Sequence, residues 1–492
     1  MVRNVWGAAD CPIQANLAYL PLWFHHIDLA PYPSIQATIE HVERRPPIEK
    51  PWHQRELSPQ WNRIENHLTQ IGDLRTPPHL AINPFQNPCK DIVSTMAPLS
   101  LDALRDEMRA ERDLLIVQDL DGVCMPLVKD PLTRSLRADY VKAAAGMQNH
   151  FSVLTNGEHE GRRGVNRLVE QALGDNEKAQ REGLYLPGLA AGGVQFQDRF
   201  GVVSHPGVSD EEMSFLESVP QRMGDLLRLK LSQVLPELQG QALEEELKLA
   251  ILDTQVSPTI NLNSLFSRIK GDVVRQRQLQ LMLSNLMDSL MSDATAAGLP
   301  RSFFLHVAPN LGHDSTGQER IKPSETGDVG TTDIQFMLKG AIKEVGLLVL
   351  INRHIAQKTG TAPLGDTFNV RTAPHDHQAL LDLCHQRIEQ DAIPMLVGVG
   401  DTVTSTPCPS GDGWLRGGSD RGFLTLLQQL GTSYNRPAHV VLVDSSHGEV
   451  DRPNLSDSQL SGISDPDDPL RFDCLVKGGP EEYVDWFKTL PH

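Results

Sequence analysis

The chain has 492 residues, with 63 acidic and 45 basic side chains and a formal net charge of −18. This length predicts about two to three structural units. The acidic excess disfavours nucleic acid or an anionic membrane as the main partner, because both repel a negative surface. No apolar run approaches the roughly 20 residues needed to span a bilayer, and six cysteines without a C-x-x-C pair argue against a zinc site or a disulfide framework. We therefore expect a soluble, cytoplasmic protein.

Residues 1–97 differ in character from the remainder. Stretches such as "RRPPIEKPWH" are rich in proline and show no sustained periodicity, which predicts a poorly ordered leader without chemistry. A start of translation at Met96 is an alternative interpretation of this segment. The sequence that follows, "APLSLDALRDEMRAERD", has the pattern of an amphipathic helix.

From Leu114 onward, short apolar runs alternate with stretches of helical composition. The strand candidates are "LLIVQ", "FSVLTNGE", "IPMLVGVGDT" and "HVVLVDSS". Near-continuous apolar runs separated by helices indicate an α/β fold, with a doubly wound parallel sheet that is buried on both faces. Ligands of such sheets bind at the carboxyl ends of the strands, where the polar tails of these runs lie.

The middle of the chain has another pattern. Residues 159–332 combine glycine-rich strand candidates with long helical stretches, one of which opens with a capping box formed by Ser209 and Glu212. We predict an inserted α/β cap domain over 159–332, with the two parts of the core at 98–158 and 333–492.

Two acids, Asp119 and Asp121, follow the first strand candidate directly. On the tetrapeptide alone, Asp-Leu-Asp-Gly is a turn signal. A carboxylate at a strand end can also attack a phosphoryl group and hold it covalently. That chemistry needs a second acid for proton transfer and cations around the phosphate, and Thr155, Asp401 and a lysine follow other strand candidates or open a helix.

These segments, taken in order, resemble the four motifs of the haloacid-dehalogenase superfamily of phosphatases: "LLIVQDLDGV", "FSVLTNGE", a lysine opening a helix, and "LVGVGDT". The insertion after the second motif resembles the α/β cap of the sugar phosphatases in that superfamily. Over roughly residues 110–490, the chain also resembles the cyanobacterial glucosylglycerol 3-phosphate phosphatases, which complete the synthesis of an osmolyte used in salt stress.

The resemblance implies a role for each motif residue. Asp119 would be the nucleophile and a ligand of Mg²⁺. Asp121 would be the general acid/base, with its backbone carbonyl on the metal. Thr155 would hydrogen-bond the phosphoryl group beside Asn156, and Asp401 would bind Mg²⁺.

Two positions offer alternatives. Lys339 and Lys343 both lie near the third motif, and the spacing of Lys343 to the glycine and leucines that follow it favours Lys343. Many related phosphatases carry a second acid four residues after the metal-binding one, but this chain has Ser405 there. Asp412 and Asp420 are the candidate replacements, and we favour Asp420 because helix-forming residues follow it directly.

A large cap implies a small substrate enclosed away from water. Discrimination would then come from polar side chains that face its non-reacting part, and the candidates are Glu158, His306, Asn310 and Arg421. Glu158 is the first choice, and a solvated hinge acid is its alternative. The resemblance implies a sugar phosphate substrate and, as a partner, the glucosylglycerol-phosphate synthase. The alternatives are a sucrose or trehalose phosphate phosphatase and a regulatory protein on a degenerate core.

Overall fold

The computed structural model describes residues 98–490, with the exception of 253, 316 and 409. The predicted leader at 1–97 lies outside these described residues. None of the helices within them is long and apolar enough to cross a bilayer. The cysteines in the described part of the chain are free thiols.

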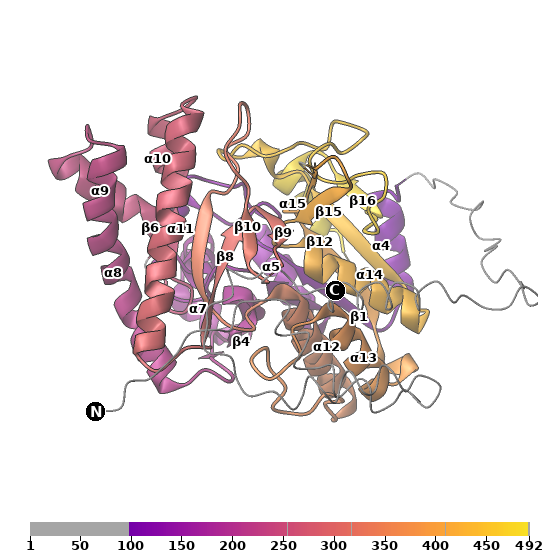
Figure 1. The fold of residues 1–492 in the computed structure, drawn as a ribbon. Coiled ribbons are helices and arrows are strands. Elements are labelled where there is room, and N and C mark those ends of the chain that lie inside the picture. The colour runs from indigo at the N-terminus through magenta and orange to yellow at the C-terminus, as the bar shows by residue number, and fades with distance from the viewer. Residues whose placement is uncertain (1–97, 253, 316, 409, 491–492) are drawn as a thin grey trace, which may run out of the picture. The chain divides into compact units, whose positions relative to one another are not determined.

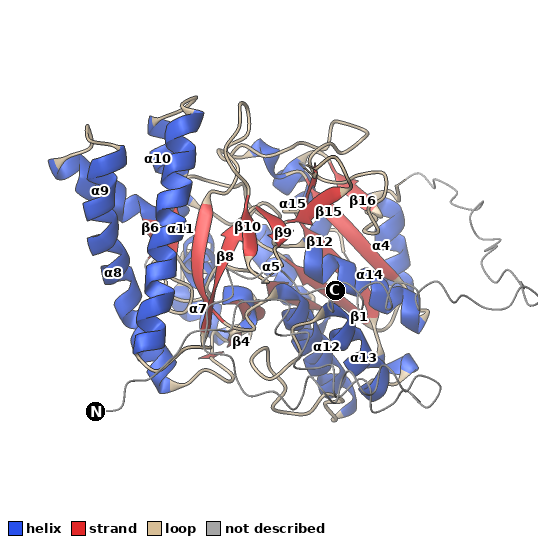
Figure 2. Cartoon of the chain, viewed as in Figure 1, coloured by secondary structure: helices blue, strands red, loops and turns tan. Residues whose placement is uncertain are grey.

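A large mixed sheet forms the centre of the core domain, with the strand order β16-β15-β12-β1-β2-β3-β4-β5. From β16 to β3 neighbouring strands are parallel, and β4 and β5 extend the sheet in antiparallel fashion. Figure 2 shows helices flanking these strands. The strands are β1 (Leu114–Gln118), β2 (Phe151–Leu154), β3 (Gly188–Ala190), β4 (Gln195–Gln197), β5 (Val203–Ser204), β12 (Met395–Gly400), β15 (Ala438–Val443) and β16 (Cys474–Val476).

Alternate residues of β1 enter two separate hydrophobic clusters, as the period of two in a strand requires. Leu115 and Val117 pack in one cluster with residues of helices α12 and α14. Leu114 and Ile116 pack in the other with residues of α4, α5 and α15. All five residues of β1 are buried, so the apolar run is explained by burial on both faces, and the predicted doubly wound parallel sheet is confirmed.

Helices cover both faces of this sheet (Figure 1). The predicted helix after Met96 is α4, in which Leu104 and Met108 are buried. The core helices are α4 (Leu101–Ala110), α5 (Ala138–Gly146), α6 (Val165–Leu173), α7 (Asn176–Arg181), α12 (Lys343–Thr359), α13 (His377–Arg387), α14 (Arg421–Tyr434) and α15 (Gly479–Phe487).

The cap domain contains a smaller antiparallel sheet with the order β6-β7-β11-β8. Its long helices α8 and α11 lie side by side (Figure 1), and α8 begins at the predicted capping box of Ser209 and Glu212. The cap elements are α8 (Asp210–Val234), α9 (Gly240–Ala250), β6 (Ile251–Leu252), β7 (Thr259–Asn261), α10 (Asn263–Arg268), α11 (Val273–Ala296), β8 (Phe303–Ala308) and β11 (Asp333–Leu338). Two hairpins complete the fold: β9 (Asn310–His313) with β10 (Glu319–Ile321), and β13 (Thr404–Pro407) with β14 (Trp414–Gly417).

Strand pairing divides cap from core at other positions than the predicted 159 and 332. Strands β3, β4 and β5 pair with β2 and with one another in the large sheet, so the segment up to Ser204 belongs to the core. Strand β11 pairs with β7 and β8, so Asp333–Leu338 belongs to the cap. The cap therefore runs from α8 to β11, and the core resumes just before α12.

A buried polar network lies at the end of β1, one residue before Asp119. Gln118 donates a hydrogen bond to the Tyr140 hydroxyl at 2.6 Å and accepts one from the Tyr483 hydroxyl at 2.7 Å. All three residues are fully buried. The network ties the central strand to α5 and α15, and it satisfies polar groups that would be costly to leave unpaired.

Substitution Tyr483→Phe is expected to lower the free energy of unfolding by about 1–3 kcal/mol, because the Gln118 carbonyl would lose its partner in a dry site. Urea unfolding followed by tryptophan fluorescence measures this change. The matched control is Tyr434→Phe, whose hydroxyl makes a longer hydrogen bond of 3.4 Å to the Ile388 carbonyl and should matter less. Equal effects of the two substitutions would contradict the assigned role of the network.

Candidate active site

The predicted motif residues meet at one edge of the large sheet. Strand β1 lies between β12 and β2 and runs parallel to both. Asp119 follows β1, Thr155 follows β2 and Asp401 follows β12, so the three side chains lie at neighbouring carboxyl ends. The backbone amide of Asp119 donates a hydrogen bond to the Val399 carbonyl of β12 at 2.9 Å, as the strand residues before it do. This bond holds the backbone of Asp119 at the end of β1.

Lys343 is the first residue of α12, and its side chain reaches two of the acids. Its Nζ lies 2.6 Å from Asp119 Oδ2 and 2.7 Å from Asp420 Oδ1. Burial alone would lower the pKa of Lys343, but the Asp119 and Asp420 carboxylates outweigh burial and hold that pKa above its usual value. Lys339, the alternative, is exposed. Lys343 is thus the lysine that contacts the predicted nucleophile.

Asp119, Asp401 and Asp420 form a compact acidic cluster, with one oxygen of each lying within 4.8 Å of the others. Asp420 Oδ2 is fixed by the backbone amides of Asp401 and Thr402, both at 2.9 Å. Ser405 is not part of this cluster, because its hydroxyl donates to Asp465 instead. Asp412 is exposed, so Asp420 is the replacement acid that reaches the cluster.

The cluster has the properties of a divalent cation site. Burial raises the pKa of Asp119 to about 7 despite the opposing charge of Lys343. Burial, together with Asp420 and Asp119, raises the pKa of Asp401 well above its usual range. Asp401 Oδ2 is also buried without a hydrogen-bond partner. These raised pKa values mean that full ionisation of the three acids needs a further cation beside Lys343, and carboxylate oxygens are the ligands that Mg²⁺ prefers. The residues fit that ion.

Gly122 explains the glycine of the Asp-Leu-Asp-Gly motif. It has a φ of +80°, and a Cβ at this position would lie 2.3 Å from Asp401 Oδ2. Any side chain would be strained by the backbone angle and would push into Asp401. The turn interpretation therefore holds, and the same turn brings the first motif close to Asp401 of the fourth motif, as the catalytic interpretation requires.

Asp121 pairs with an arginine that the sequence analysis did not assign. Arg134 Nη1 lies 2.8 Å from Asp121 Oδ2, with 8% and 30% of the two side chains exposed. The same guanidinium donates to the backbone carbonyls of Pro131 and Arg163. Arg134 ends the stretch "DPLTR" thirteen residues after Asp121, and nothing in that local pattern identifies it as the partner.

Thr155 and Asp121 both lie close to Gly157. A Cβ built at Gly157 would lie 3.7 Å from Thr155 Oγ1 and 3.9 Å from both Asp121 Oδ2 and Arg134 Nη1. The Thr155 hydroxyl is buried and accepts a hydrogen bond from the Gly157 amide at 3.3 Å. The candidate phosphate-binding hydroxyl and the candidate proton donor thus both lie beside Gly157.

Three of the predicted substrate-binding residues form one hydrogen-bond network between core and cap. Asn156 Nδ2 lies 3.0 Å from His306 Nε2, and His306 Nδ1 lies 2.8 Å from Glu319 Oε1. Asn310 donates to the other Glu319 oxygen at 3.0 Å, and its own carbonyl accepts from the Thr404 hydroxyl at 2.9 Å. Burial lowers the pKa of His306, but Glu319 outweighs burial and holds that pKa above its usual value.

Glu158 has partners other than the predicted substrate. Its carboxylate accepts hydrogen bonds from the backbone amides of Gln255, Val256 and Ser257 at 2.7–2.8 Å, and from the Ser257 hydroxyl at 2.9 Å. Glu158 is 3% exposed. Burial raises its pKa, which these donors oppose. Neither solvated nor free for a ligand, Glu158 anchors a cap loop on the core.

Arg421, like Glu158, is hydrogen-bonded to other residues of the protein. Its Nη1 and Nη2 atoms lie 2.9 and 2.8 Å from the two oxygens of buried Asp468. Its remaining donors reach the backbone carbonyls of Thr404, Ile463 and Gly417. All three of its nitrogen atoms make hydrogen bonds within the protein, so in this structure the predicted substrate ligand Arg421 instead fastens the loop before β16.

Comparisons with known proteins show the family to which the chain belongs. The sequence profile of the glucosylglycerol-phosphate phosphatase family matches residues 113–491. The glucosylglycerol-phosphate phosphatase of Synechocystis sp. is 47% identical over 387 residues, which cover 76% of this chain and 92% of that protein.

Two solved structures illustrate more distant similarity. The C-terminal domain of trehalose-6-phosphate phosphatase from C. albicans covers 80% of this chain and 97% of its own, at 13% identity and a TM-score of 0.41. A haloacid dehalogenase-like hydrolase from B. subtilis covers 77% and 99%, at 12% identity and a TM-score of 0.28. Because the family profile and the Synechocystis relative both span most of the chain, this protein belongs to the glucosylglycerol-phosphate phosphatase family and is a phosphoric monoester hydrolase.

Proposed function

We propose that the protein hydrolyses glucosylglycerol 3-phosphate to glucosylglycerol and phosphate, in a Mg²⁺-dependent reaction with an aspartyl-phosphate intermediate. The observation that carries the proposal is the buried contact of Lys343 with Asp119 and Asp420 beside Asp401. The substrate follows from membership in the family and from the named activity of the Synechocystis relative.

Asp119 acts as the nucleophile in the proposed first step. One of its carboxylate oxygens attacks phosphorus, and the bond from phosphorus to the glycerol oxygen breaks. Asp121 gives its proton to the departing alkoxide. Lys343 and the Thr155 hydroxyl hold the phosphoryl oxygens, which carry more negative charge as the reaction proceeds.

Asp121 acts as a base in the proposed second step. It takes a proton from water, whose oxygen attacks the phosphorus of the aspartyl-phosphate and releases inorganic phosphate. Arg134 orients the Asp121 carboxylate through their 2.8 Å contact. Bound at Asp119, Asp401 and Asp420, with the Asp121 carbonyl as a further ligand, Mg²⁺ would neutralise charge on the phosphoryl oxygens.

The cap supports a small substrate, because its contacts through Glu158 and Asn310 hold it against the core beside the acids. Sucrose or trehalose phosphate is the alternative substrate, and a regulatory protein without turnover is the alternative class. Phosphate release from a panel of sugar phosphates, with Mg²⁺ or with EDTA, separates them. We further propose that the reaction takes place in the cytoplasm next to the synthase that makes the substrate.

Asp119→Asn is expected to abolish turnover while preserving the fold, because an amide cannot form the acyl-phosphate. Phosphate release and the melting temperature measure the two effects. Asp412→Asn is the matched control, since Asp412 is exposed and should tolerate the change. Turnover near the wild-type rate in a folded Asp119→Asn protein, verified by mass spectrometry, would rule out this nucleophile.

Asp121→Asn is expected to slow turnover by about 10²–10⁴-fold, the usual contribution of general acid–base catalysis. Steady-state phosphate release under saturating substrate measures the loss. Asp391→Asn, at an exposed position outside the site, serves as the control. If the rate is unchanged in Asp121→Asn, another group transfers the proton.

Glu158→Gln is expected to loosen the cap and to reduce turnover of glucosylglycerol 3-phosphate and of an aryl phosphate by the same factor. One carboxylate oxygen becomes an NH₂ group that faces backbone donors, and hydrogen bonds to a charged group contribute roughly 1.5–3 kcal/mol. Hydrogen exchange at residues 255–257 should accelerate. Glu160→Gln, at the exposed neighbouring glutamate, should change neither property. A loss confined to glucosylglycerol 3-phosphate would instead return Glu158 to substrate recognition.

A further inference from the structure

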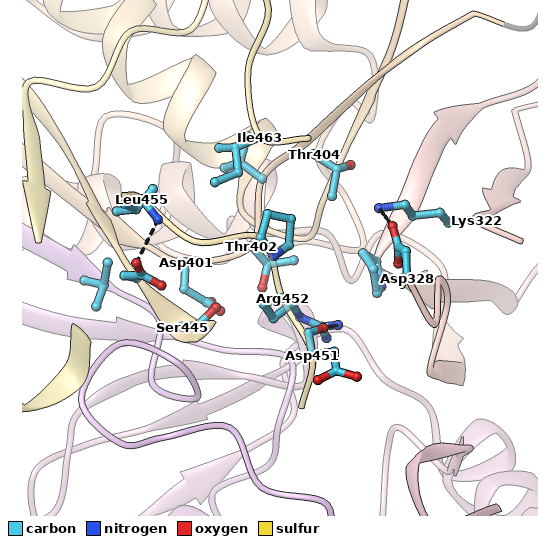
Figure 3. A pocket seen from close by; sticks show the side chains of 15 residues that line it. Lys322, Asp328, Asp401, Thr402, Thr404, Ser445, Asp451, Arg452, Leu455 and Ile463 are labelled. Carbon is cyan, nitrogen blue, oxygen red and sulfur yellow. Dashed lines mark hydrogen bonds and ion pairs between the residues drawn. The ribbon is translucent and has the colours of Figure 1, made fainter. Parts of the chain in front are cut away.

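The cap lies close against the core beside the acidic cluster. The cavity between Asp401 of the core and the Lys322–Asp328 pair of the cap (Figure 3) has a volume of about 20 Å³. That space holds about one water molecule, so a sugar phosphate cannot pass between these walls while the cap is in this docked position. Entry of a substrate here requires the cap to move, and contacts between cap and core are then broken and re-formed in each turnover.

The loop at residues 158–165, which follows strand β2, is closed on itself by backbone hydrogen bonds. The amide of Val165 donates to the Glu158 carbonyl at 2.9 Å, and the amide of Asn166 donates to the His159 carbonyl at 2.9 Å. These two bonds tie the end of the loop to its beginning. The loop is therefore compact, and its residues are held in fixed positions relative to one another.

Two side chains of this loop contact the cap. Glu158 binds the cap residues 255–257, and Arg163 Nη2 donates to the Lys248 carbonyl at 2.9 Å. Lys248 lies in the last turn of α9, where carbonyl groups have no partner within the helix and attract a cation. Arg163 is 5% exposed, so its charge lies inside the boundary between cap and core. The contact with Lys248 exists only while α9 is docked.

Arg134 connects the same loop to Asp121. Its Nη2 donates to the Arg163 backbone carbonyl, its Nη1 lies 2.8 Å from Asp121 Oδ2, and its Nε donates to the Pro131 carbonyl at 3.1 Å. Only 8% of the Arg134 side chain is exposed. A planar guanidinium whose three nitrogen atoms are all bonded has one orientation, so the position of the Arg163 carbonyl affects where the Asp121 carboxyl group is held.

We propose that Arg163 is a positioning residue, which couples the docking of α9 to the orientation of Asp121 through Arg134. The inference rests on the proposed function, in which Asp121 gives its proton to the departing alkoxide. With the cap docked, Arg163 holds the loop in place and Arg134 aligns the Asp121 carboxyl group with the leaving oxygen. With the cap open, the bond to Lys248 is absent, the loop is free to shift, and protonation slows. Efficient cleavage of the ester is thereby restricted to the enclosed substrate.

The test compares two leaving groups in single turnovers, with enzyme in excess over substrate. Arg163→Met removes the side-chain donors but keeps the backbone carbonyl that Arg134 binds. Release of glucosylglycerol from its 3-phosphate should slow about tenfold, the size expected from one hydrogen bond to a charged group. Release of 4-nitrophenol from 4-nitrophenyl phosphate should change by less than about twofold, because this leaving group departs without a proton. Arg181→Met, at an arginine of α7 whose side chain is 63% exposed, is the matched control and should change neither rate.

A second comparison shows whether the two arginines act in one chain. Arg134→Gln removes the fork of donors between the loop and Asp121, and should slow the release of glucosylglycerol about 100-fold. If Arg163 acts through Arg134, adding Arg163→Met to Arg134→Gln should cause little further loss. Losses that multiply in the double variant would show that Arg163 acts independently, and would contradict the coupling.

Other outcomes would also overturn the assignment. Equal slowing of both leaving groups by Arg163→Met would place its effect on the nucleophile or on the fold, and unchanged rates for both would remove the coupling. If Arg163→Met does not fold, Arg163→Gln keeps a polar side chain that is too short to reach Lys248, and the same two rates decide. A wild-type enzyme that does not hydrolyse glucosylglycerol 3-phosphate would contradict the proposed function itself. The same variants would then be compared on the sugar phosphate that it does hydrolyse, where multiplying losses would contradict only the coupling.

Discussion

The ammonium group of Lys343 is the interaction on which the site depends. Asp119, Asp401 and Asp420 lie within a few ångströms of one another at the end of a buried sheet, where like charges repel strongly because little water screens them. Lys343 is itself 3% exposed and contacts two of the three. One cation cannot balance three ionised carboxylates, and the remaining negative charge is what makes the residues fit the divalent ion of the proposed function.

The packing of α12 against the sheet places Lys343 beside the acids. A Cβ at Gly346 would lie 2.6 Å from Leu154 Cδ1 of β2, so the glycine lets the first turn of α12 approach the sheet closely. The helix buries Val345, Leu347 and Leu348 against the same cluster as Leu115 and Val117. Hydrophobic burial along α12 thereby offsets the cost of placing its first residue, a charged lysine, in the interior.

The cap is held to the core by polar contacts at several separate points. Glu158 binds the 255–257 loop through four hydrogen bonds, and Arg371 of the core pairs with Glu212 at the start of α8. Asn310 is hydrogen-bonded to the core at Thr404 and Gly418. Such contacts are directional, so they define one closed arrangement. Their small individual energies are also compatible with the opening that substrate entry requires.

The sequence by itself determined the sheet and which acids meet at its carboxyl edge. A strand buried on both faces must be apolar throughout, so the runs that became β1, β2, β12 and β15 were visible as such. The acids that follow them could be assigned because parallel strands bring their carboxyl ends together. Gly122 was part of the same local signal, since its left-handed backbone and its closeness to Asp401 both exclude a side chain.

Only the tertiary structure decided which domain strands β3 and β11 join, and which residues the polar side chains bond to. The residue patterns of strands β3 and β11 do not say which sheet each strand joins, and pairing with strands distant in the sequence decides it. The hydrogen-bond donors to Glu158 lie about a hundred residues away in the sequence. Asp468, the partner of Arg421, lies after the next strand of the chain. Arg134 and Arg163 carry no motif at all. A charged side chain is compatible with solvent, a ligand or another residue, and the choice among these depends on three-dimensional contacts that local sequence does not encode.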